Sequence, residues 1–200
     1  LAFHQVWEEA FVGGAEVGTR DAAAGQGDRF AAARAVEEGG QAGATEHLSA
    51  LDDLAVGLER LGRSSDAAEL MRRKLRLQAD FEEAWWQSPP EPARSGLAAR
   101  PLSDAELALY RTYANLGTFL MHDAYPRAMA GEDSARRAMG EGLEYIRKSI
   151  AINPGAHFGR ETWQVAAASF ILAALDRPEL LLDYDMAGNR LHDAPIPDGR

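Results

Sequence analysis

Glycines and large apolar residues between Tyr113 and Pro154 are spaced as in two antiparallel helices that cross closely. Gly117 and Gly142 are the small residues that let two backbones approach, and Pro154 ends the second helix because it lacks an N–H donor and clashes with the preceding turn. The pattern predicts a helical pair. The space beside the crossing is filled by Tyr113, Leu116, Leu120, Ile146 and Ile150.

A similar arrangement occurs earlier in the chain, where the stretch from Leu61 to Ala68 is typical of a helix, a tight turn and a second helix. Gly62 can take the left-handed conformation that ends the first helix, and Ser64 or Ser65 can cap the second. The spacing is repeated by Leu51, Leu54, Ala55, Leu58, Gly62, Ala67 and Met71. We expect the two units to pack through Leu51, Leu54, Leu58, Met71 and Leu75 against Tyr113, Leu116 and Leu120.

The order of these anchors resembles that of the tetratricopeptide (TPR) repeat, a helical pair that stacks on its neighbours. The resemblance covers residues 48–79 and 110–154, and a poorer third unit begins near Phe158. The two clear units start farther apart than the about 34 residues of one repeat, so we expect an insertion at residues 79–103. A second insertion, at residues 123–138, falls in the turn between the two helices of the later unit.

The resemblance implies an all-α fold, a TPR-like α–α superhelix with degenerate N-terminal helices and two insertions. We expect the repeat array at residues 45–175, after N-terminal helices and a Gly-rich loop at 1–44, and before a short helix and an irregular tail at 176–200. The stretch from Asn153 to Gln164 is similar to one in uncharacterised bacterial TPR proteins, many of them exported. This similarity favours a periplasmic or extracellular bacterial protein over a cytoplasmic one.

Several helix boundaries inside the array can be predicted. Ser103 or Asp104 starts a long helix that ends near His122, and Glu106 is available for a capping box. The helix over residues 66–78 carries a basic run, which we interpret as a solvent-exposed face rather than a binding patch. The run consists of Arg72, Arg73, Lys74 and Arg76.

The formal net charge of −10 argues against a nucleic-acid partner, because binding the phosphate backbone needs clustered lysines and arginines. The chain has no cysteine, which excludes disulfides and thiolate metal sites. No apolar run reaches the about 20 residues of a membrane span, and the longest, residues 165–175, suits a buried helix. Because the sequence begins at Leu1 rather than Met, an upstream signal peptide or anchor stays open.

No sequence motif for catalysis or for cofactor binding is present. The five histidines are scattered without ligand spacing, so we expect no metal, no cofactor and no enzymatic activity. His157 lies near Arg160 and Glu161, a polar cluster that we interpret as a helix cap with ion pairs rather than a catalytic site. The glycine-rich stretch at 13–18 lacks a preceding strand and is interpreted as a linker.

The resemblance implies a non-enzymatic scaffold that binds a protein or peptide partner through the concave face formed by the first helix of each repeat. Asn115 stands where peptide-clamping TPR domains often place an asparagine that holds the ligand backbone. Asp53 takes that place in the first unit, a departure that argues against an acidic C-terminal ligand. The groove residues carried over are Asp52, Val56 and Arg60 from the first unit and Arg111, Asn115, Thr118 and His122 from the second.

Alternatives stay open for the two insertions and for the function of the chain. Trp85 and Trp86 precede a Pro-rich stretch and form either a recognition surface or a cover over the edge of the array. The insertion that contains Tyr125 can close over a bound peptide, or residues 79–103 can fill the groove from within. In the alternative function the chain is a structural subunit of a larger complex, with Trp85, Trp86 and Tyr125 as interface anchors.

Overall fold

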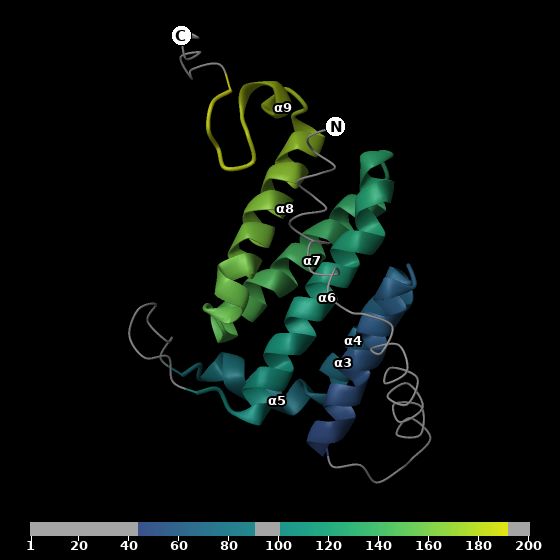
Figure 1. Ribbon diagram of the computed structural model, residues 1–200, viewed down its shortest axis with the longest axis vertical. Helices are drawn as coiled ribbons and strands as arrows, with labels where there is room; N and C mark the ends of the chain where they lie inside the picture. Colours follow the sequence, from purple (N-terminus) through teal and green to yellow (C-terminus); the bar gives the residue numbers. More distant parts are fainter. Residues whose placement is uncertain (1–43, 91–100, 192–200) are drawn as a thin grey trace, which may run out of the picture.

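The computed structural model describes residues 44–90 and 101–191, and every regular element in these ranges is a helix (Figure 1). The elements are α3 (Ala44–Arg60), α4 (Ser64–Leu77), α5 (Ala79–Gln87), α6 (Asp104–Met129), α7 (Asp133–Ile152), the short 3-10 helix η2 (Ala156–Gly159), α8 (Arg160–Asp176) and α9 (Leu180–Asp183). The predicted all-α fold is confirmed for these ranges. Of the N-terminal helices and Gly-rich loop expected at 1–44, residues 1–43 lie outside them.

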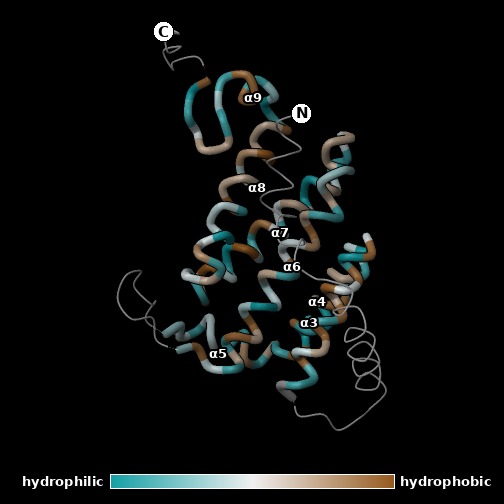
Figure 2. Tube along the Cα trace, viewed as in Figure 1, coloured by the Kyte–Doolittle hydropathy of each residue, from teal (hydrophilic) through white to brown (hydrophobic). Residues whose placement is uncertain are grey.

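The long helices α6 and α7 form the centre of the structure. They pack against each other, with the α3–α4 pair on one side and α8 on the other (Figure 1). Apolar and polar stretches alternate along the helices, as expected for helices that bury one face (Figure 2). The array is therefore built from neighbouring antiparallel helices.

Gly117 of α6 and Gly142 of α7 lie where the two central helices cross, as the sequence predicts. A Cβ atom added to Gly142 would lie 2.8 Å from the carbonyl oxygen of Gly117, and one added to Gly117 would lie 2.7 Å from the carbonyl oxygen of Gly142. Each glycine thus meets the backbone of the other helix, which leaves no room for a side chain. At the end of this pair, α7 stops at Ile152, two residues before Pro154.

The turn between α3 and α4 contains Gly62 in the predicted left-handed conformation, with φ of 72°. The predicted serine cap is wrong, because α4 begins at Ser64 itself and Arg63 takes the N-cap position without a side-chain cap. The Nε of Arg63 lies 2.6 Å from Oδ2 of Asp66, so an ion pair between exposed side chains stands beside this helix start.

The core of the first pair largely follows the prediction. Leu51 and Met71 share a buried cluster with Leu116 and Leu120, and Leu58 and Leu75 pack against it. Tyr113 belongs instead to a neighbouring cluster, which consists of Trp85, Leu109, Tyr110, Tyr113 and Ile152 and which Leu75 also touches.

The start of α6 is the predicted capping box. The Ser103 hydroxyl accepts from the Glu106 amide, and the Ser103 amide donates to Glu106 Oε2 at 2.9 Å. The predicted end near His122 is wrong, because α6 continues through Pro126 to Met129. The expected insertion at 123–138 is therefore no loop: it lengthens α6 and α7 around a turn at residues 130–132.

Burial explains why this insertion is helical. Its small residues Ala124, Ala128 and Ala135 are buried in one cluster with Met139 and Ile171 of the neighbouring helices. Tyr125 is half-buried and packs against the same cluster. The apolar face of the extension thus covers α8, so Tyr125 is part of the core and not of a loop over the groove.

The insertion at 79–103 is also partly helical. Residues 79–87 form α5, on which Trp85 is only 8% exposed and Trp86 is 39% exposed. Beyond the array, the predicted last short helix is α9, and Tyr184 and Arg190 form an isolated antiparallel bridge after it. Within the described ranges, no helix has the length and apolar character needed to cross a membrane.

Candidate functional site

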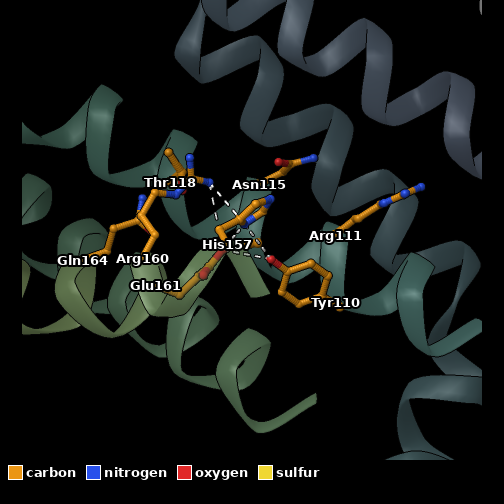
Figure 3. A pocket seen from close by; sticks show the side chains of 9 residues that line it. Tyr110, Arg111, Asn115, Thr118, His157, Arg160, Glu161 and Gln164 are labelled. Atoms are coloured by element: carbon orange, nitrogen blue, oxygen red, sulfur yellow. Dashed lines mark hydrogen bonds and ion pairs between the residues drawn. The ribbon is translucent and has the colours of Figure 1, made fainter. Parts of the chain in front are cut away.

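A small hollow lies between α6 and the beginning of α8 (Figure 3). Its volume of about 120 Å³ is below the roughly 300–1,000 Å³ of typical small-molecule sites, so it suits one side chain of a larger ligand. α6 contributes Tyr110, Arg111, Ala114, Asn115 and Thr118, and η2 with α8 contributes His157, Arg160, Glu161 and Gln164.

Three side chains converge at the floor of the hollow. The Tyr110 hydroxyl donates to Glu161 Oε1 at 2.8 Å, and His157 Nδ1 lies 2.7 Å from the same oxygen (Figure 3). The Glu161 side chain is 4% exposed, whereas that of His157 is 55% exposed. This network joins α6 to η2 and α8 and fixes the position of His157.

The network also sets the charges in the hollow. Burial alone would raise the pKa of Glu161, but hydrogen bonds from His157, a backbone amide and Tyr110 outweigh it and hold that pKa below its ordinary value. Burial, together with the hydrogen bond to Glu161, raises the pKa of Tyr110 well above its ordinary value. At neutral pH, Glu161 is ionised and Tyr110 is a donor.

Two arginines stand at the sides of the hollow. In Figure 3 the Arg111 and Arg160 side chains lie on opposite sides of His157, and Arg111 extends away from the network. Arg111 is exposed, and its charge acts on Asp52, Lys74 and Tyr110 without a direct hydrogen bond or ion pair to a described residue. Arg160 is 52% exposed and only distantly paired, with 4.0 Å from its guanidinium to Glu161 Oε1. Both cations are open to a ligand.

Of the groove residues predicted on α6, three line the hollow and one does not. Arg111, Asn115 and Thr118 belong to its wall. His122 instead forms a close contact with Glu59 of α3 through Nδ1, and its side chain is 15% exposed. The α6 face therefore divides into a part open towards α8 and a part that packs against α3.

The residues predicted on α3 lie apart from the hollow. Asp52, expected to face a ligand, is 9% exposed, and its Oδ1 accepts from Lys74 Nζ at 2.6 Å and from Asn115 Nδ2 at 3.4 Å. Val56 is half-buried against the core cluster of Leu51, and Arg60 is exposed at the end of α3. The predicted groove over α3 is thus occupied at Asp52 by the chain itself.

The prediction that Lys74 is exposed is also wrong. Its place in the basic run of α4 predicts a solvent-exposed side chain, but it is fully buried and also donates to the Ala108 carbonyl at 3.4 Å. Burial lowers the pKa of Lys74 and raises that of Asp52, and the attraction between the two charges opposes both shifts. The other side chains of the run whose pairs are seen, Arg72 and Arg76, bind Glu141 and Glu69 near the surface.

The tryptophans form no common exposed surface. Trp85 is buried, with its indole Nε1 3.4 Å from Glu106 Oε1, so of the two alternatives its position favours a cover over the edge of the array rather than a recognition surface. Trp86 donates to the Tyr113 hydroxyl at 2.8 Å. The Lys148 ammonium lies 5.7 Å from the Trp86 ring centroid and 5.1 Å from that of Tyr113, within cation–π range. The Trp86 side chain is therefore held against Tyr113 and Lys148, and it stays 39% exposed.

Sequence reasoning missed half of the hollow. The sequence pattern does not single out Tyr110, and for His157, Arg160 and Glu161 it predicts only a helix cap with ion pairs. The signal that could have found it is the spacing of the polar residues His157, Arg160, Glu161 and Gln164 at intervals of three to four positions, which is typical of one helix face, although His157 itself precedes α8.

No group of acidic or histidine side chains within residues 44–90 and 101–191 has an arrangement that could hold a metal ion. The donors available in the hollow are guanidinium, amide, hydroxyl and imidazole groups, which can bind a carboxylate or a peptide backbone. Comparison with protein-family models, with curated proteins and with solved structures gives no match.

Proposed function

We propose that this chain is a TPR-like interaction module that binds a segment of a polypeptide partner in the hollow between α6 and α8, with an acidic side chain of that segment between Arg111 and Arg160. The chain acts as a scaffold and performs no chemistry on its partner. The proposal concerns the α6–α8 hollow and not the α3 surface, where Asp52 is already paired with Lys74.

The observation that carries the proposal is the charge of the hollow. Its single carboxylate, Glu161, is buried and already accepts from Tyr110 and His157. The two arginines are exposed and have little or no pairing of their own. An incoming carboxylate therefore meets accessible positive charge, although the chain as a whole carries −10. Guanidinium groups bind carboxylates through charge-assisted hydrogen bonds.

The remaining polar groups suit an extended peptide. Thr118 carries a hydroxyl group, and Asn115 keeps an amide acceptor and a second N–H beside its bond to Asp52, so both can pair with the unpaired backbone of a ligand. Gln164 lines the hollow as well but is only 4% exposed. The described residues of the 79–103 insertion do not line the hollow. Asp53, whose charge argues against an acidic C-terminal ligand, lies on α3 and is not among the lining residues either.

Fluorescence anisotropy with three labelled peptide pools tests the proposal. The pools share randomised flanks and differ in one central residue, which is Glu, Gln or Lys. We expect the Glu pool to bind most tightly and to weaken with added salt. We expect Arg111→Gln with Arg160→Gln to weaken it by about tenfold or more at an unchanged melting temperature, because each charged hydrogen bond contributes about 1.5–3 kcal/mol.

Arg76→Gln is the matched control, since Arg76 is a 63% exposed arginine on α4, outside the hollow. A preference for the Lys pool, or equal binding by the double variant and the control, would contradict the proposed site.

A structural subunit is the second candidate, and exposed apolar side chains favour it. Leu61 is 72% exposed and Leu182 is 69% exposed, at separate places on the array. Isolated exposed residues of this kind are common on monomers, which is why this function is placed second. Gel filtration with light scattering separates the two candidates: a monodisperse monomer supports a transient binder, and aggregation of the isolated chain supports a permanent subunit.

A further inference from the structure

The three residues that lead into α8 have left-handed backbone conformations. His157 has φ of 46°, Phe158 has φ of 58° and Gly159 has φ of 81°. A glycine adopts this conformation freely, but a bulky side chain does so at a cost in free energy. Within residues 44–90 and 101–191, His157 and Phe158 are the non-glycine residues with positive φ.

The contacts of His157 offset its own strain, but Phe158 has no comparable compensation. His157 is held by Glu161 Oε1 at 2.7 Å and by the Tyr110 hydroxyl at 3.1 Å. The Phe158 side chain is fully exposed, at 107% of its reference area. A strained backbone and an exposed aromatic ring both disfavour phenylalanine at this position in the isolated chain. Strained residues of this kind cluster at binding and switch sites.

The position of the ring indicates what it can contact. His157 and Arg160, on either side of Phe158 in the chain, both line the hollow. Phe158 therefore lies in the chain between two residues of the hollow, two positions before the arginine that an acidic side chain would bind, although its own side chain is not among the lining residues. Exposed aromatic rings with little internal packing are frequent anchors of protein interfaces.

We propose that Phe158 is the apolar anchor of this binding surface: it packs against an apolar side chain of the partner segment, next to the acidic side chain that the hollow receives. The inference rests on the proposed function and extends the ligand that the site recognises: an acidic residue followed or preceded by an apolar one. The network of Tyr110, His157 and Glu161 holds the turn in place before binding, which reduces the ordering that binding requires.

Two peptide pools test this inference, one with a central Glu-Leu pair and one with a central Glu-Ser pair in the same randomised flanks. Phe158→Gly removes the ring and accommodates the left-handed backbone, so we expect an unchanged or higher melting temperature. We expect the variant to bind the Glu-Leu pool about 30-fold more weakly, as at an interface hot spot, and the Glu-Ser pool as the wild type does. Leu61→Ala is the control for nonspecific hydrophobic binding, because Leu61 is another exposed apolar residue and lies in the α3–α4 turn, away from the hollow.

Several outcomes would overturn the inference. Unchanged Glu-Leu binding by Phe158→Gly would show that the ring takes no part, and a melting temperature several degrees lower would show that the ring supports the fold. Concentration-dependent self-association that Phe158→Gly abolishes would identify a second copy of the chain as the occupant. If the Arg111 and Arg160 variants lose Glu binding while Phe158→Gly does not, this inference alone fails. If the wild type prefers no Glu pool, the proposed function fails as well.

Discussion

The crossing of α6 and α7 gives the sharpest test of the fold, through the variant Gly142→Ala. The added Cβ would lie 2.8 Å from the Gly117 carbonyl oxygen, 3.1 Å from Met121 Cγ and 3.2 Å from Leu120 Cβ. The nearest of these atoms belongs to the backbone, so the clash is relieved only if the two helices separate. Overpacking of this kind costs about 1–3 kcal/mol, against a gain in helix propensity of about 0.5–1 kcal/mol.

Gly140→Ala is a matched control two residues away in the same helix. No heavy atom outside the local backbone lies within 4 Å of a Cβ added there, so this variant keeps the propensity gain without the clash. The two variants therefore differ by the overpacking cost alone, about 1–3 kcal/mol. For a chain of this size, each kcal/mol corresponds to about 2–4 °C in melting temperature.

Thermal and urea denaturation followed by far-UV circular dichroism measures this difference. We expect Gly140→Ala to melt above the wild type, Gly142→Ala to melt below it, and Gly142→Leu to melt lowest of all. If Gly142→Ala is as stable as Gly140→Ala, the two backbones do not meet at this residue and the close crossing is refuted.

Three further predictions concern buried polar groups. Lys74→Met removes the ion-pair partner of the buried Asp52 carboxylate, so we expect the free energy of unfolding, measured by urea denaturation, to fall by about 3–5 kcal/mol. The double variant with Asp52→Leu should recover most of that loss. A Lys74→Met variant as stable as the wild type would contradict the buried pair. Because the pKa of Glu161 is lowered in the folded state, the ionised carboxylate stabilises the fold above its ordinary pKa of 4.5, and this contribution is lost as pH falls through the folded-state pKa. The melting temperature of Glu161→Gln should therefore fall less steeply in acid than that of the wild type. Burial and the hydrogen bond to Glu82 raise the pKa of Tyr113, so its contribution to stability is complete below the ordinary value of 10.0 and is lost as pH rises through the folded-state pKa. In an ultraviolet pH titration, the wild type should show a tyrosine that ionises late and that is missing in Tyr113→Phe. Identical titrations of the two proteins would contradict this prediction.

The sequence by itself determined the helical framework. Gly62, Gly117 and Gly142 occur where a left-handed turn or a close backbone approach requires them, and Ser103 with Glu106 encodes a helix start through local hydrogen bonds. These features are readable because their physical cause is local or periodic: one backbone conformation, one capping geometry, one spacing of small and large side chains.

Only the tertiary structure decided which polar side chains are available for binding. Lys74 stands in a basic run of α4, and although it shares a helix face with the buried Ala67 and Met71, its charge is stabilised there because Asp52, 22 residues away, reaches it across the first helical pair. Trp85 and Tyr125 lie on helices that the insertions themselves form, and each packs against the central helices: Trp85 against α6 and α7, and the half-buried Tyr125 against the cluster that joins α6, α7 and α8. The hollow needs Tyr110 of α6 and Glu161 of α8 to meet, 51 residues apart in the chain. The pairing of side chains depends on neighbours brought together by the packing of whole helices, and helical spacing along one segment does not encode which partner a side chain meets.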